Sequence, residues 1–183
     1  ARHQVLGEHL APRAKAQLPP NPETIAEAVE ILWNAKRPLV ITGRGARGAG
    51  PALAAMLDVL DALYLDTSES RGLLPDSHPA VVSSLRGQVM EEADVVLTIG
   101  RKLDFQLAYG SPAIFKNTRF VRLAEHAEER RDNRRGCPEI VATPALALEA
   151  IVAAAGNRKP AIDQKWVQEM RATHAKKRAK FSK

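Results

Sequence analysis

The 183 residues, 45% hydrophobic and 26% charged, have the composition of one folded domain, and no apolar run approaches the roughly 18 residues that a membrane span needs. Cys137 is the only cysteine, which excludes a disulfide framework and a cysteine-based metal site and predicts a reducing, cytoplasmic location. The net charge of +6 does not predict a nucleic-acid-binding face, because the last thirteen positions hold six basic residues and no acid, and the rest of the chain is neutral.

The first twenty residues have no sustained hydrophobic period and end at two prolines, so residues 1–20 are expected to form an N-terminal connector. A helix should follow, because Asn21 is a good N-cap and Pro22 suits the first helical position. Four apolar side chains then fall on one helical face before the pattern ends at Pro38: Ile25, Val29, Leu32 and Trp33.

The next segment is a short apolar run, residues 38–42, that breaks into glycines. Gly43, Gly45 and Gly48 spell G-x-G-x-x-G, whose glycines permit positive φ and can expose backbone N–H groups to a phosphate at the following helix. A nucleotide or diphosphate site is one interpretation. The other is a turn between a strand and a helix that needs glycine without any ligand.

Beyond this turn the chain alternates short apolar runs with helical segments, which predicts a doubly wound α/β sheet, mostly parallel, with helices on both faces. Strands are expected at 39–41, 62–65, 95–99, 120–123 and 140–142, and helices from 51, at 86–93 and at 144–155. Residues 95–99 are the strongest strand and should be central. We expect one domain over residues 21–157 and a basic, solvated helical linker over 158–183.

No arrangement of side chains predicts catalysis or a metal site. The five histidines are scattered and are interpreted as surface or loop residues: His3, His9, His78, His126 and His174. Ser68 and Ser70 fit turn chemistry better than a nucleophile. The acids between 125 and 132 alternate with arginines, which is typical of a solvated helix.

A dinucleotide-binding module of an oxidoreductase is an alternative, because Asp66 ends the second strand, where NAD(P)-binding folds keep the acid that binds the ribose. Pro51 argues against this alternative. It starts the helix late and leaves Gly48 in the loop, whereas the third glycine of that fingerprint normally packs helix against strand.

Three segments in order, residues 35–46, 70–79 and 92–105, resemble the central domain of thiamine-diphosphate-dependent enzymes of the acetolactate synthase, oxalyl-CoA decarboxylase and 2-hydroxyacyl-CoA lyase group. Residues 103–110 are similar to acetolactate synthase-like members. The resemblance implies a six-stranded Rossmann-like sheet between a pyrimidine-binding and a diphosphate-binding domain of a homo-oligomeric parent. Those domains would supply thiamine diphosphate and Mg²⁺, so this chain alone should be inactive.

The resemblance also implies a nucleotide site for FAD or ADP. Its residues would be Gly43, Arg44, Gly45 and Ala46 of the glycine turn, Arg71 and Gly72, and Gly100, Arg101 and Lys102 after the central strand. Relatives often carry arginine at position 102 and acids where Ala124, His126 and Thr143 stand, although Thr143 should still cap its helix. FAD or ADP binding is therefore expected to be weak or absent, and the domain to be a spacer with a vestigial nucleotide site or a purely structural assembly domain.

Overall fold

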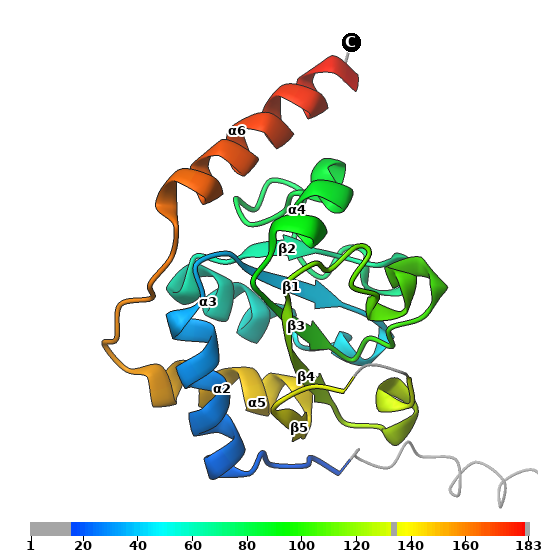
Figure 1. Ribbon diagram of the computed structural model, residues 1–183. Helices are drawn as coiled ribbons and strands as arrows, with labels where there is room; N and C mark the ends of the chain where they lie inside the picture. Colours follow the sequence, from blue (N-terminus) through cyan, green and yellow to red (C-terminus); the bar gives the residue numbers. More distant parts are fainter. Residues whose placement is uncertain (1–15, 133–134, 182–183) are drawn as a thin grey trace, which may run out of the picture.

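The computed structural model describes residues 16–132 and 135–181, in which a parallel sheet lies between two layers of helices (Figure 1). The strands are β1 (Pro38–Thr42), β2 (Leu63–Leu65), β3 (Val95–Ile99), β4 (Arg119–Ala124) and β5 (Glu139–Val141). The helices are α2 (Pro22–Asn34), α3 (Gly50–Leu60), α4 (Arg86–Glu92), α5 (Pro144–Ala155) and α6 (Gln164–Phe181). The predicted α/β class is confirmed.

The five strands run parallel in the order β2-β1-β3-β4-β5. Val40 of β1 pairs with Tyr64 on one side and with Leu97 of β3 on the other. All five residues of β3 are buried, as are all five of β1, because helices cover both faces of the sheet. The central position predicted for residues 95–99 is confirmed.

A single residue takes the position of a sixth strand beside β2. Val81 forms an isolated parallel bridge with Tyr64, whose N–H donates to the Ala80 carbonyl at 2.7 Å. If this short segment is numbered as the third strand in the chain, the spatial order becomes 3-2-1-4-5-6, the order of dinucleotide-binding folds. The described residues therefore form five regular strands, and the sixth strand that the resemblance implied is reduced to a single bridge at Val81.

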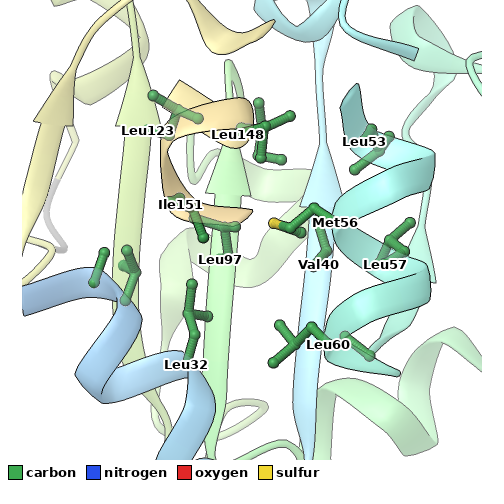
Figure 2. Close-up of a cluster of buried hydrophobic side chains, with 14 of the residues drawn as sticks. Leu32, Val40, Leu53, Met56, Leu57, Leu60, Leu97, Leu123, Leu148 and Ile151 are labelled. Carbon is green, nitrogen blue, oxygen red and sulfur yellow. The ribbon is translucent and has the colours of Figure 1, made fainter. Parts of the chain in front are cut away.

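Alternate residues of each strand face two separate hydrophobic clusters. Val40, Leu97 and Leu123 point toward the layer formed by α2, α3 and α5, where they meet Leu32, Met56 and Leu148 (Figure 2). Leu39, Ile41 and Val96 face the opposite layer, which includes α4 and α6. Successive side chains of a strand point to opposite faces of the sheet, and here both faces are packed against helices.

The predicted starts of the helices follow local chemistry. Asn21 caps α2 by accepting hydrogen bonds from the N–H groups of Glu23 at 2.8 Å and Thr24 at 3.4 Å. Thr143 occupies the N-cap position of α5, but its side chain does not cap that helix. Its hydroxyl instead accepts from the Leu18 N–H at 2.8 Å, so the capping role expected for Thr143 is wrong.

The first turns of helix α6 pack against the domain, although the charge of this segment predicted a solvated helix. Trp166, Val167 and Met170 lie on one side of its first turns and are buried in the cluster that also contains Leu39 and Val96. The Trp166 indole N–H donates to Glu92 of α4 at 2.6 Å. The C-terminal half of α6 is mostly exposed and extends past the other elements (Figure 1). None of the helices described here is long and apolar enough to cross a membrane.

Candidate functional site

The strand order reverses between β1 and β3, and ligands of doubly wound sheets bind beyond the carboxyl ends of the strands at such a reversal. The loops after these two strands are the glycine turn, residues 43–48, and the segment that begins at Gly100. The predicted nucleotide-site residues of both loops therefore lie at the same edge of the sheet. Their hydrogen bonds and packing decide whether a phosphate could enter.

Several backbone N–H groups of the glycine turn already donate hydrogen bonds inside the protein. Gly43 donates to the Ile99 carbonyl and Gly45 to the Gly100 carbonyl, both at 3.0 Å, and Ala46 donates to the Gly43 carbonyl at 3.0 Å. A phosphate-binding turn needs such groups directed at the ligand. Here the first two join the glycine turn to the end of β3 and to Gly100, and the third closes the turn itself.

Gly43 and Gly45 do not provide the positive φ expected of them. Among the three glycines of the motif only Gly48 has a positive φ, of 87°, while Gly43 is extended at −133°. Close approach explains the other two positions. A Cβ on Gly43 would lie 2.5 Å from the Gly100 carbonyl oxygen, and one on Gly45 would lie 2.6 Å from Cδ of Glu129. The Glu129 carboxylate thus lies against the turn at Gly45.

Gly100 makes the tightest approach in this region. Its φ is 52°, and a Cβ there would lie 2.6 Å from the Ala46 backbone nitrogen. Arg101 follows with 8% of its side chain exposed and donates two hydrogen bonds to the Asp104 carboxylate, at 2.9 and 3.1 Å. It also donates to Gln106 at 2.9 Å, so its guanidinium is held within its own loop. Lys102 is exposed.

The second predicted segment lies beside the glycine turn but faces elsewhere. Arg71 has 79% of its side chain exposed and lies 3.8 Å from Asp66, and Gly72 has a φ of 87°. Both residues line a cleft that neither Gly45 nor Gly100 lines. Arg44 is exposed on the turn itself. The nine predicted residues therefore divide between two places.

A buried hydroxyl network fixes the loop that precedes Arg71. The Thr42 carbonyl at the end of β1 accepts from the Thr67 and Ser70 hydroxyls at 2.8 and 2.9 Å. The Thr42 hydroxyl lies 2.7 Å from the Tyr64 hydroxyl. Burial raises the pKa of Tyr64 to about 12, because the phenolate would be poorly solvated there. Ser70 is thus a turn residue, as predicted.

The acidic segment after β4 contains a buried ion pair instead of a solvated helix. Only residues 127–130 form one short 3-10 helix, and Asp132 beyond it is 2% exposed. Its carboxylate accepts from Arg122 at 2.7 and 2.8 Å. Arg122 is 1% exposed and also donates to the carbonyls of Arg101 and Glu129 at 3.2 and 2.8 Å. The pair ties the loops after β3 and β4 together.

Sequence reasoning missed this pair, although one signal was present. Arg122 lies inside the apolar strand 119–124, and a charge in a buried strand needs a partner. The structure also places the two positions at which the resemblance implies ribose-binding acids in relatives. Ala124 is the buried last residue of β4, and His126 directly precedes the 3-10 helix.

A hollow of about 600 Å³ lies between residues 66–76, residues 81–84 and the C-terminal half of α6; we call it the loop–helix cleft. His174 of α6 lines it and is only 8% exposed, so its interpretation as a surface histidine is wrong. Burial, and secondarily the nearby Arg178, lower the pKa of His174, while Asp76 raises it by less. In the described residues no cluster of three His, Cys, Asp or Glu side chains could hold a metal ion.

A family model described as "Thiamine pyrophosphate enzyme, central domain" matches residues 25–151, which is most of the chain. The chain belongs to this family of central domains. Oxalyl-CoA decarboxylase of Escherichia coli is 30% identical over 136 residues, covering 73% of this chain and 24% of that protein. 2-Hydroxyacyl-CoA lyase 1 of Dictyostelium discoideum is 31% identical over 143 residues, covering 76% and 24%.

Solved structures agree with this central-domain fold. Benzoylformate decarboxylase of Polynucleobacter necessarius superimposes with a TM-score of 0.63 at 16% identity, covering 84% of this chain and 32% of that one. The chain spans about a quarter of the length of the two curated relatives, oxalyl-CoA decarboxylase and 2-hydroxyacyl-CoA lyase 1. The family predicted from residues 35–105 is confirmed.

Proposed function

We propose that this central domain is the spacer and subunit-contact domain of a thiamine-diphosphate-dependent decarboxylase or lyase, and that it catalyses nothing by itself. The relatives named above support a parent reaction that breaks or forms a carbon–carbon bond next to a carbonyl. An acetolactate synthase-like branch stays a prediction from residues 103–110. The single cysteine fits the cytoplasmic location predicted from the sequence.

The residues present do not fit thiamine diphosphate and its Mg²⁺. The chain contains no Gly-Asp-Gly sequence, with which the family's magnesium site begins, and the described part has no cluster of acidic or histidine ligands. Pyrimidine-binding and diphosphate-binding domains of the parent would have to supply both, in the homo-oligomer that the resemblance implies. No step of the reaction is assigned to this chain.

We infer further that neither FAD nor ADP binds tightly between β1 and β3. The observation that carries this inference is the direct packing of Gly45 on Gly100, with the Gly45 N–H donating to the Gly100 carbonyl. A diphosphate would have to break that bond and displace the Glu129 carboxylate. Ala124 and His126 offer no carboxylate to a ribose, and one missing acceptor costs about 1–3 kcal/mol.

A dinucleotide-binding module is the second candidate, because the strand order 3-2-1-4-5-6 favours it. Asp66, directly after β2, would be the acid that binds the ribose, and its carboxylate lies 3.8 Å from the Arg71 guanidinium. This candidate needs the same glycine turn to receive a diphosphate, so the closed contact between Gly45 and Gly100 weakens it equally.

Calorimetric titration of the chain with FAD, ADP and NADH tests both candidates. We expect no saturable binding of any of the three at concentrations up to about 1 mM, which corresponds to about −4 kcal/mol. The variant Glu129→Gln removes the carboxylate next to Gly45 while keeping its size, and it should bind no better, because the backbone contact still closes the turn. Stoichiometric micromolar binding of FAD or ADP would refute the spacer role, and tight NADH binding would establish the second candidate.

A further inference from the structure

We propose that the loop–helix cleft is a binding site for a small organic anion, a carboxylate or a phosphate monoester. The cleft lies beyond the carboxyl ends of β2 and of the strand position at Val81, which is the edge where doubly wound sheets bind ligands. Its volume of about 600 Å³ is in the range of small-molecule sites. The site consists of this chain's own residues, so it does not depend on thiamine diphosphate or on the parent reaction.

Two arginines from different elements line the cleft. Arg71 comes from the loop after β2, and Arg178 comes from α6. Guanidinium groups bind carboxylates and phosphates through paired, charge-assisted hydrogen bonds. Arg178 donates one hydrogen bond to the Asp76 carbonyl, which anchors it at the rim of the cleft. An anion between the two arginines would contact both cations.

The acids of the cleft balance its arginines, but the pair of Asp66 with Arg71 is weak enough for a ligand to replace it. Asp66 and Asp76 also line the cleft, so its two arginines and two aspartates balance. The Asp66 carboxylate and the Arg71 guanidinium are 3.8 Å apart, and most of the Arg71 side chain is exposed. An ion pair this long and exposed is weak, so Arg71 can turn to a ligand at little cost.

His174 supplies the observation that indicates a ligand. Its Nδ1 accepts from the Ser84 N–H at 3.4 Å and lies 2.7 Å from the Ser84 hydroxyl oxygen. Nε2 therefore carries the proton in the neutral ring, and it is buried with no hydrogen-bond partner among the described residues. A buried donor without an acceptor is costly, and a ligand oxygen that reached Nε2 through a small shift of the cleft wall would supply the acceptor.

The remaining wall selects an organic anion over a bare ion. Leu74, Pro75 and Val81 line the cleft beside the charged groups. They provide apolar surface for the hydrocarbon part of the ligand, and small-molecule sites usually combine such surface with a few polar groups. Phenyl phosphate should therefore bind more tightly than inorganic phosphate, and benzoate more tightly than acetate.

The experiment follows the imidazole of His174 by NMR while phenyl phosphate, inorganic phosphate, benzoate and acetate are added to the whole chain. We expect a saturable shift of the His174 signals with phenyl phosphate or benzoate, and a rise in the His174 pKa on binding, because an anion stabilises the imidazolium. Comparison of the two ligands assigns the site to phosphates or to carboxylates.

Three variants separate the site from general screening of charge. Arg71→Gln and Arg178→Gln should each weaken binding about tenfold, because each removes one charge-assisted contact. Lys177→Gln is the matched control, since it removes the same charge from the same turn of α6 and Lys177 does not line the cleft. Arg71 is exposed on a loop, so its variant tests the site even if Arg178→Gln loosens the helix.

The proposal is wrong if no ligand gives a saturable shift of the His174 signals at concentrations up to about 20 mM. A site with two charge-assisted contacts should have a Kd below that concentration. The proposal is also wrong if Lys177→Gln weakens binding as much as the two arginine variants. Equal affinities for phenyl phosphate and inorganic phosphate would refute the role given to Leu74, Pro75 and Val81.

Discussion

Replacing Asp132 with asparagine should destabilise the domain by about 3–5 kcal/mol, because the substitution leaves the charge of Arg122 buried without its counter-ion. The two side chains are only 1% and 2% exposed and share hydrogen bonds of 2.7 and 2.8 Å. Asparagine keeps the size of the side chain and one acceptor oxygen. The loss therefore reports on the missing charge and not on a cavity.

Thermal unfolding followed by circular dichroism measures this loss. One kcal/mol corresponds to about 2–4 °C for a domain of this size, so the Tm should fall by about 6–20 °C. Arg135→Gln is the control, because its ion pair with Glu139 spans 3.6 Å and Arg135 is 76% exposed. That variant should change stability by less than about 1 kcal/mol. An Asp132→Asn protein as stable as this control would refute the reasoning.

Two further predictions use other features of the same edge of the sheet. Gly100→Ala should destabilise the domain by about 3 kcal/mol, because the new Cβ would collide with the Ala46 nitrogen and because alanine disfavours the φ of 52° at this position. Gly87→Ala in α4 is the control, since there is open space around Gly87, and it should be neutral or slightly stabilising in the same thermal assay. Tyr64 should ionise with a pKa of about 12, above its ordinary 10.0, so its contribution to stability is complete below pH 10 and is lost as the pH rises toward 12. Tyrosinate absorbance compared between wild type and Tyr64→Phe checks this value, and a Tyr64 signal appearing near pH 10 would contradict it.

The parts of the fold that follow from local chemistry could be predicted from the sequence. The capping by Asn21 and the fully buried run 95–99 each identify an element without knowledge of its neighbours. The bridge at Val81 could not be predicted in this way. It is a single residue in a segment rich in turn formers, and only its pairing with Tyr64 shows the position of a sixth strand.

The site depends on contacts between distant segments, and these limit what a single sequence can reveal. The G-x-G-x-x-G pattern correctly marked a turn, but the direction of its N–H groups depends on Gly100, more than fifty residues later. The burial of His174 could have been suspected from its spacing. Trp166, Met170 and His174 recur every four residues on one side of α6, a pattern typical of a packed helix face, but the surrounding basic residues obscured it.

The contact between Gly45 and Gly100 has a consequence for protein engineering. Because main-chain atoms of Gly45 and Gly100 pack directly on each other, placing acids at positions 124 and 126 would add ribose acceptors without opening the contact between these two loops. Building a nucleotide pocket in this domain would require the two loops to move apart first, through a longer connection after β1 or β3. Grafting a whole loop is therefore a more promising design than exchanging individual residues.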